Sequence, residues 1–199
     1  MPFTADGKAG VWGLQPPKNP LSDFCFWQQS CQKQKKTNMP YTPILATLAY
    51  IMSPDGQRVL MIHRNARPDD LHYGKYNGLG GKLEANEDVV TGVRREIREE
   101  AGVEVDQLTL RGTVSWPGFA GDEDWFAFIF RIESWSGDPT MANHEGSLQW
   151  VPVAQLQELN LWDSDRLWLD MVFDDDPRPF HGIAPYESGV MVSWSFVRV

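Results

Sequence analysis

The pattern of apolar and polar residues predicts strands on both sides of one amphipathic helix. Between residues 88 and 101, valine, isoleucine and alanine recur every four positions, which is the spacing of one helix face. Apolar runs at 41–51 and 59–63 are rich in strand-forming residues, and the proline-aspartate-glycine turn between them predicts a hairpin. Further along we expect strands at 108–115, 125–132, 148–151 and 190–199, a loop at 117–124, a helical turn at 153–159 and a second helix at 163–173.

Strands that precede and follow a helix are typical of an α/β fold, and 199 residues suit one domain with a substantial core. Residues 1–38 mix Gly, Pro, Gln and Lys with scattered aromatics and show no period. We therefore expect an N-terminal extension at 1–38, poorly structured or packed on the domain, and one domain at 39–199. Within the extension, Phe24, Phe26 and Trp27 are the candidates for such packing.

Three glutamates on the predicted helix indicate a metal site. Glu96, Glu99 and Glu100 stand at positions i, i+3 and i+4, so their carboxylates share one face. Like charges this close repel each other unless a cation neutralises them, and carboxylate oxygens suit Mg²⁺, or alternatively Mn²⁺. A solvated helix face with ion pairs to Arg95 is the other interpretation. The glycines that flank the segment favour the metal.

These glycines lie where the chain has to turn. Gly80 and Gly81 permit a tight loop that brings backbone carbonyls close to a ligand, and Gly102 is placed to end the helix as its cap. Arg95 and Glu99 can pair along the helix, and Glu87 precedes the first helical turn, where a negative charge suits the helix dipole and an arginine is within reach. The segment is therefore predicted to be a ligand-binding loop that leads into a helix.

Residues 81–103 match, without substitution, the pattern G-x5-E-x7-R-E-U-x-E-E-x-G-U, in which U is a bulky aliphatic residue. The segment resembles the signature of the Nudix hydrolase superfamily. This resemblance implies an α/β/α sandwich with a mixed central sheet and a loop-helix catalytic motif, and Mg²⁺-dependent hydrolysis of a diphosphate linked to a nucleoside. It implies a metal site made by the Gly80 carbonyl, Glu96, Glu99 and Glu100, in which these glutamates are catalytic and Glu96 orients or deprotonates the attacking water.

The segments around the signature are similar to the MutT/MutX-type 8-oxo-dGTP diphosphatases, from about residue 41 into the last predicted strand. In that subgroup an acidic residue from a loop completes the metal site, and Glu145 holds that place. The resemblance implies hydrolysis of oxidised purine nucleoside triphosphates to the monophosphate and pyrophosphate, which is nucleotide-pool sanitation in support of DNA repair. The alternatives are a dinucleoside polyphosphate, ADP-ribose or the 5′ end of RNA, an ordinary nucleotide such as dGTP, or a ligand sensor without catalysis.

The resemblance also implies a base pocket. Asn77 matches the asparagine that reads the purine in the mammalian sanitising enzymes, and Trp162, Asp165 and Trp168 match positions that stack on the base or hydrogen-bond to it. The mammalian pocket carries two adjacent acidic residues, whereas Ser164 stands in place of the first. This departure puts the mammalian mode of base recognition in question.

Other residues are candidates from their chemistry alone. Arg64 and Lys82 flank the glycine loop and are suited to phosphate contacts. Phe119 and Tyr76 can add flat walls to a base pocket. His63 could serve as a ligand or base, but a lone histidine at a strand end is more often structural, which is the role that we expect. By default we assign four of the nine tryptophans to packing, namely Trp116, Trp125, Trp135 and Trp150.

Composition narrows the range of partners. A net charge of −9 and a pI near 4.9 argue against binding of a nucleic-acid polymer, which requires many cationic contacts, but allow a free nucleotide. No apolar run is long enough to span a bilayer and no signal peptide is evident, so we expect a cytoplasmic protein without a membrane partner. Cys25 and Cys31 are expected to be reduced thiols. A monomer and a homodimer are both compatible with the sequence.

Overall fold

The computed structural model describes residues 40–121 and 123–199. Residues Thr42–Val199 form one compact unit by their contacts. Phe24, Phe26, Trp27 and both cysteines lie outside the described residues. Among the described residues, no helix has the length and apolar composition that crossing a membrane requires.

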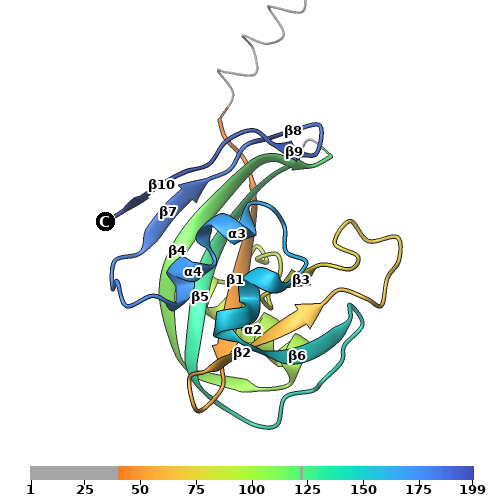
Figure 1. Ribbon diagram of the computed structural model, residues 1–199, viewed down its shortest axis with the longest axis vertical. Helices are drawn as coiled ribbons and strands as arrows, with labels where there is room; N and C mark the ends of the chain where they lie inside the picture. The colour runs from red at the N-terminus through yellow and green to blue at the C-terminus, as the bar shows by residue number, and fades with distance from the viewer. Residues whose placement is uncertain (1–39, 122) are drawn as a thin grey trace, which may run out of the picture. The chain divides into compact units, whose positions relative to one another are not determined.

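A mixed sheet is the centre of the unit 42–199 (Figure 1). The described residues form an eight-stranded sheet in the order β10-β7-β4-β5-β1-β2-β3, with β6 also paired to β2. β1 pairs with β5 and β4 with β7 in parallel, whereas β1–β2, β2–β6 and β4–β5 are antiparallel. The strands are β1 (Ile44–Met52), β2 (Arg58–His63), β3 (Tyr76–Asn77), β4 (Glu104–Ala120), β5 (Glu123–Ser136), β6 (Ser147–Pro152), β7 (Phe180–Ile183) and β10 (Ser195–Arg198).

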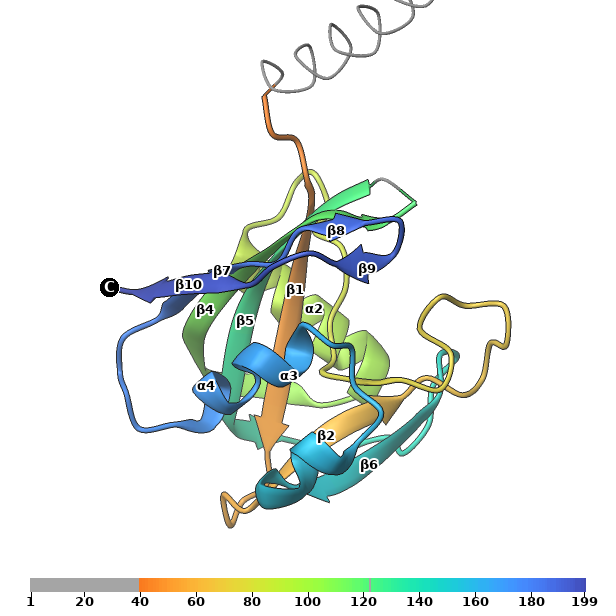
Figure 2. The same cartoon turned by 45° about the horizontal axis from the view of Figure 1, so that its top comes forward.

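Helices cover both faces of this sheet (Figures 1 and 2). α2 (Val89–Ala101) packs on one face, and η1 (Val153–Glu158), α3 (Asp165–Trp168) and α4 (Asp170–Phe173) pack on the other. Because side chains alternate along a strand, Ala49 and Ile51 of β1 belong to the core under α2, whereas Ala46 and Tyr50 belong to the core under the other helices. The predicted α/β/α sandwich is confirmed.

α2 begins and ends where the sequence predicts. The Asp88 carboxylate caps the first turn by accepting hydrogen bonds from the backbone N–H groups of Val90 and Thr91, at 2.8 and 3.0 Å. Gly102 ends the helix with φ of 71°, a left-handed conformation that favours glycine, and its N–H donates to the Arg98 carbonyl at 3.0 Å. The hairpin of β1 and β2 is likewise confirmed.

The C-terminal part of the fold differs from the prediction. The helix expected at 163–173 is interrupted at Leu169, which separates α3 from α4. Its backbone hydrogen bonds alternate between two spacings. The Leu169 N–H donates to the Asp165 carbonyl four residues back, whereas the Val172 N–H donates to the Leu169 carbonyl three residues back. The strand expected at 190–199 is divided into β9 (Val190–Met191), which pairs with β8 (Tyr186–Glu187), and β10. β7 and β3 were not predicted.

The loop expected at 117–124 is mostly part of the β4–β5 hairpin. β4 continues to Ala120 and β5 starts at Glu123, with a bulge between Trp116 and Ala120. Gly118 has φ of 70° and its N–H donates to the Asp124 carboxylate at 2.9 Å, so the bulge is held locally. Phe119, within this bulge, lines the cavity of the candidate active site.

Candidate active site

A cavity of about 490 Å³ lies at the junction of α2, β1, the ends of β4 and β5, and three loops. It brings together residues that are far apart in the sequence, including almost the whole predicted site. The predicted residues that line it are Arg64, Asn77, Gly80, Lys82, Glu96, Glu99, Glu100, Phe119, Glu145, Trp162 and Asp165.

The glycine loop runs against β1. Thr47 N–H donates to the Gly81 carbonyl at 2.8 Å, and Ala49 exchanges backbone hydrogen bonds with Leu79 at 2.6 and 2.9 Å. Gly80 has φ of 141°, and a Cβ there would lie 2.3 Å from the Thr47 carbonyl oxygen. Only glycine fits this approach, which places the loop beside the carboxylates of α2.

Arg95 ties the acidic groups of the loop-helix segment together. Its guanidinium donates to both oxygens of Glu87, at 2.7 and 3.0 Å, and to Glu96 at 2.9 Å and Glu99 at 3.3 Å. It also donates to the Lys82 carbonyl at 3.3 Å. The predicted Arg95–Glu99 pair is therefore formed, and the arginine that Glu87 reaches is Arg95. One cation compensates only part of the surrounding negative charge.

Two of the three helix glutamates have raised pKa values. Burial raises the pKa of Glu100 to about 8, although a hydrogen bond from Gly80 N–H at 2.9 Å favours its charged form. Burial also raises the pKa of Glu96, against the opposing effect of Arg95. Carboxylates whose ionisation is this unfavourable gain most from a neighbouring cation, so the donor set fits a divalent metal ion.

Glu145 comes to the cavity from the loop before β6. Its backbone N–H donates to the Asn143 side chain at 2.9 Å, and a Cβ at Gly146 would lie 1.9 Å from the His63 carbonyl, so the loop is closely packed on the end of β2. The Glu145 carboxylate is paired with Arg64 and with Arg67, the latter at 2.7 Å. Among residues 40–121 and 123–199, no group of three acidic, histidine or cysteine side chains is arranged to hold a metal ion.

The two candidate phosphate ligands differ in their surroundings. Arg64 is mostly buried and pairs with Glu145 and Asp70, so its charge is shared by two carboxylates. The Lys82 ammonium lies 5.1 Å from the centre of the Trp125 ring, in a cation–π contact on the cavity wall. Both cations line the cavity beside the carboxylates.

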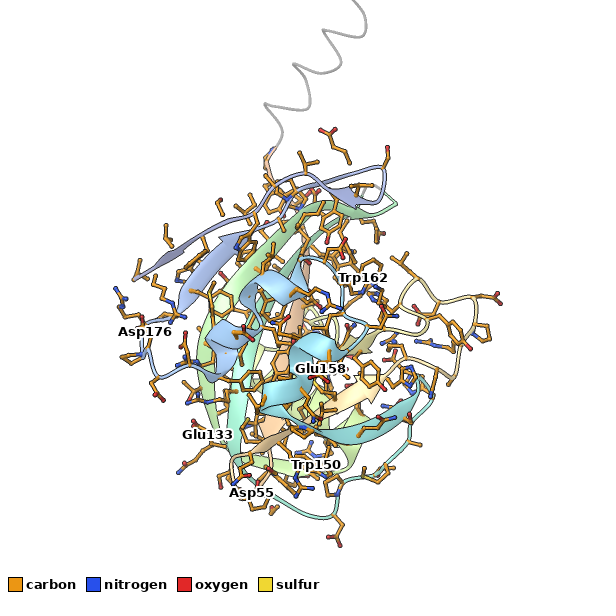
Figure 3. The ribbon with its side chains drawn as sticks, viewed as in Figure 1. Asp55, Glu133, Trp150, Glu158, Trp162 and Asp176 are labelled. Atoms are coloured by element: carbon orange, nitrogen blue, oxygen red, sulfur yellow. The ribbon has the colours of Figure 1, made fainter. Side chains whose placement is uncertain are left out.

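Aromatic side chains form the other end of the cavity. Trp162, on the segment between η1 and α3 (Figure 3), meets Phe119 edge to face at a centroid distance of 5.0 Å. Its indole N–H donates to His72 Nδ1 at 3.0 Å, and the Lys75 ammonium lies 5.1 Å from its ring centre. Trp116 completes this end of the cavity.

A short chain of polar groups lies behind the aromatic wall. Trp116 Nε1–H donates to Ser164 Oγ at 3.2 Å, and the Ser164 hydroxyl donates to Asp165 Oδ1 at 3.2 Å. Burial raises the pKa of Asp165 to about 7. Near neutral pH this carboxyl is therefore able to accept a hydrogen bond when charged and to donate one when protonated.

Asn77 adds a polar group from β3. Its backbone pairs with Ile62 of β2, and its Oδ1 atom is buried without a hydrogen-bond partner among the described residues. The hydroxyl of Thr47, which also lines the cavity, is likewise buried without a hydrogen-bond partner among the described residues. Buried polar atoms without partners are costly, and a bound ligand with matching groups removes that cost.

Some residues lie elsewhere than the sequence suggested. Trp168 is fully buried in the core and does not line the cavity; it packs edge-on against Trp116, which does. Trp116 and Trp125, assigned to packing, are cavity-wall residues. Four further polar residues that line the cavity were not predicted, because nothing in the local sequence marks them as site residues. They are Thr47, His72, His144 and Ser164, the last in its role as a hydrogen-bonding group.

Two further aromatic expectations concern the neighbouring loop. Tyr76, considered as a pocket wall, stacks instead on His63 at 4.4 Å between ring centres, with an interplanar angle of 2°. Neither residue lines the cavity. His63 therefore has the structural role that was expected of it. Trp135 and Trp150 stack on each other at 6.0 Å, also away from the cavity.

The site thus joins a glycine loop, a glutamate-rich helix and a cavity lined by charged and aromatic side chains. Comparisons with known proteins identify the family. A profile of the NUDIX domain matches residues 42–172. The chain belongs to the Nudix family. It is thus a Nudix hydrolase, from a family that generally uses a divalent metal and acts on nucleotide-type substrates.

This Nudix hydrolase is similar to several individual proteins. It is 31% identical over 131 residues, 66% of this chain and 80% of the relative, to the oxidized purine nucleoside triphosphate hydrolase of Mus musculus. The protein of the same name from Danio rerio is 30% identical over 132 residues, 66% of this chain and 81% of the relative. The mutator MutT protein of Bacillus halodurans shares the fold, with a TM-score of 0.67 and 24% identity over 77% of this chain and 97% of that one.

Proposed function

We propose that this Nudix hydrolase cleaves purine nucleoside triphosphates, oxidised ones such as 8-oxo-dGTP in particular, to the monophosphate and pyrophosphate. Water adds to one of the two phosphorus atoms that flank the α–β bridging oxygen, as the bond from that phosphorus to the bridging oxygen breaks. The observation that carries this proposal is that one cavity joins the α2 carboxylates to an aromatic chamber with buried hydrogen-bonding groups. Hydrolases of oxidised purine nucleoside triphosphates are among the relatives, which supports the same substrate class.

The carboxylate end supplies the chemistry. Glu96, Glu99 and Glu100, together with the Gly80 carbonyl, are the residues that would hold Mg²⁺, with Mn²⁺ as a substitute. Bound Mg²⁺ lowers the pKa of a coordinated water and neutralises phosphate charge. The raised pKa of Glu96 suits a group that orients the attacking water and takes a proton from it.

The remaining charged groups hold the phosphates. Lys82 faces the cavity beside the glutamates and contributes a positive charge. Glu145 joins the metal site in this proposal once its carboxylate leaves Arg64 and Arg67, and the guanidinium nitrogen of Arg64 that Glu145 leaves then contacts phosphate, while Asp70 keeps the other. Substrate binding thus replaces ion pairs within the protein by ion pairs with the ligand.

The aromatic end recognises the base. Trp162 and Phe119 offer flat surfaces for stacking, while Asn77 and Asp165 supply hydrogen bonds at the edge of the base. Trp168 supports this wall from the core by packing against Trp116. The substrate is a free nucleotide of the cytoplasm rather than a nucleic-acid polymer, and the catalytic domain is 39–199, to which 1–38 is an extension.

A second candidate is another nucleoside diphosphate derivative, such as a dinucleoside polyphosphate, ADP-ribose or the 5′ end of RNA. It is favoured by Ser164, which supplies a hydroxyl where the mammalian pocket supplies a second carboxyl. The test is hydrolysis of 8-oxo-dGTP, dGTP, ADP-ribose, a dinucleoside tetraphosphate and a capped RNA side by side with Mg²⁺, with products identified. The proposal predicts that a purine triphosphate is hydrolysed fastest and releases pyrophosphate. If ADP-ribose, the dinucleoside tetraphosphate or the capped RNA is hydrolysed faster, the second candidate holds instead.

A further inference from the structure

The loop between β2 and β3 places one side chain inside the cavity and its neighbours outside. Backbone hydrogen bonds from Arg64 N–H to the Lys75 carbonyl at 2.9 Å, and from Gly74 N–H to the Arg64 carbonyl at 2.7 Å, close the base of the loop. Leu71 and Tyr73 are exposed, at 56% and 49%, whereas His72 between them lines the cavity. The loop is thus built to direct His72 inward.

A turn at Asp70 fixes the backbone of His72. The Asp70 carboxylate accepts the His72 backbone N–H at 3.0 Å, and the Asp70 carbonyl accepts the Tyr73 N–H at 2.9 Å. The other carboxylate oxygen of Asp70 is held by Arg64 and by Arg67. The His72 imidazole therefore projects from an anchored turn rather than from a free loop tip.

The His72 ring holds the indole of Trp162. Trp162 Nε1–H donates to His72 Nδ1 at 3.0 Å, with the two rings nearly perpendicular at 83° and 5.5 Å apart. Because an indole N–H can only donate, the bond requires a neutral imidazole with its proton on Nε2. The same loop supplies Lys75, whose ammonium is 5.1 Å from the Trp162 ring centre and is itself bonded to the Leu161 carbonyl at 2.9 Å.

Phe119 contacts Trp162 from the β4 side, edge to face at 5.0 Å and 77°. The indole is thus held by His72 at its N–H, by Lys75 over its ring and by Phe119. Of these, His72 makes the only directional hydrogen bond to the indole that the described residues provide. Because a hydrogen bond is directional, it restricts the side-chain torsion that sets the orientation of the indole plane more than packing contacts alone do.

We propose that His72 is a positioning residue for base recognition: by accepting the Trp162 indole N–H, it fixes the plane on which the base of the substrate stacks. The inference rests on the proposed function, in which Trp162 is the stacking wall. His72 itself does no chemistry. The β2–β3 loop accordingly determines base affinity through His72 while it contributes Arg64 to the phosphate end.

The test uses a matched pair of variants of the full chain. His72→Asn keeps an acceptor oxygen near the position of Nδ1, whereas His72→Leu has almost the same shape without the acceptor. We expect His72→Leu to raise KM for a purine triphosphate by about threefold to tenfold, the range for one neutral hydrogen bond, with kcat within about twofold of wild type. His72→Asn is expected to stay within about twofold of wild type in KM.

A readout independent of activity is the Trp162 indole N–H signal in a ¹H–¹⁵N spectrum, identified by its loss in Trp162→Phe. His72→Leu should move this signal and speed its exchange with water, and His72→Asn should restore it. Equal KM values or unmoved indole signals in both variants of an active enzyme would overturn the inference. Failure of the proposed function is seen separately, in a wild type that turns over no purine triphosphate.

Discussion

Gly81 and Glu96 lie so close that a Cβ added at Gly81 would be 2.6 Å from the Glu96 carboxylate. The glycine loop and the glutamate of α2 are thus in contact at the centre of the proposed metal site. The backbone of Gly81 does not have the positive φ of its neighbour Gly80, so alanine is compatible with the backbone there. The conflict that alanine creates falls on the end of a flexible side chain, which can move away.

Gly81→Ala is therefore expected to displace the Glu96 carboxylate without disturbing the core. We expect kcat to fall by at least about 100-fold, the scale for a misplaced general base, while the free energy of unfolding changes by less than about 1 kcal/mol. Gly80→Ala is the contrasting variant, because its Cβ would lie 2.3 Å from a backbone oxygen, and should destabilise the fold. A Gly81→Ala enzyme with wild-type kcat would show that the contact has no catalytic importance.

Removal of the helix charges tests the proposed metal site. Glu99→Gln and Glu100→Gln are each expected to lower kcat by about 100-fold or more in saturating Mg²⁺. Glu104→Gln is the control, because Glu104 pairs with Arg98 on the surface just beyond the same helix. Wild-type turnover in either of the first two variants contradicts the assignment, and a similar loss in all three would point to an unspecific effect on the helix.

In the proposed metal site, Arg67 would compete with the cation for Glu145. Its guanidinium is about half exposed and pairs with both Glu145, at 2.7 Å, and Asp70, at 3.2 Å. Exposed ion pairs contribute little to stability, so Arg67→Ala should fold normally. We expect the Mg²⁺ concentration for half-maximal activity to fall by about twofold to fivefold, on the scale of one such pair. A higher Mg²⁺ requirement in Arg67→Ala would indicate that Glu145 stays with the arginines during turnover.

The buried carboxyl of Asp165 makes stability depend on pH. Its pKa is about 7 in the folded protein, against an ordinary value of 3.8, so between about pH 4 and 7 the folded state retains a proton that the unfolded chain has lost. The free energy of unfolding therefore decreases as pH rises through this range and is level above it. Asp165→Asn removes this contribution.

We expect the stability of Asp165→Asn relative to wild type to be greater at pH 8 than at pH 5. One pKa unit corresponds to about 1.4 kcal/mol, so the change across this interval is at most about 3 kcal/mol. Urea unfolding of both proteins at the two pH values measures it. If the free energies of unfolding of the two proteins differ by the same amount at pH 5 and at pH 8, the pKa of Asp165 is not raised by folding.

The loop-helix segment could be predicted from sequence because its determinants are local. The spacing of apolar residues, the cap at Asp88 and the glycine at Gly102 each act within a few residues of the helix that they define. The order of the glutamates along α2 then fixes which of them share a face. Glu87 precedes the cap residue Asp88, so its pairing with Arg95, eight positions along the chain, depends on the fold of the loop that enters α2.

The base end could be predicted only through resemblance, because its contacts join distant parts of the chain. Trp116 and Trp125 face each other across β4 and β5, and their place on the cavity wall depends on the bulge that follows Trp116. The pairing of Arg64 with Glu145 spans 81 positions, and that of His72 with Trp162 spans 90. Neither partner in these pairs carries a local pattern that identifies the other.

The C-terminal elements were less well predicted because they are short. β7 has four residues and β3 has two, too few for a period to be detected. Trp194 lies in the chain between β9 and β10, and it packs closely on β7, because a Cβ added at Gly182 would be 2.2 Å from the Trp194 ring. An apolar run such as 190–199 resembles one continuous strand until such tertiary contacts are known.

The most direct test of the proposed function is kcat/KM for 8-oxo-dGTP and for dGTP with Mg²⁺, measured with the products identified in the same reaction. We predict a preference for 8-oxo-dGTP of about 100-fold, equivalent to about 2.7 kcal/mol of discrimination by the pocket, with monophosphate and pyrophosphate released. Equal or negligible values for both nucleotides would contradict sanitation of oxidised purines and leave a Nudix hydrolase of a different substrate.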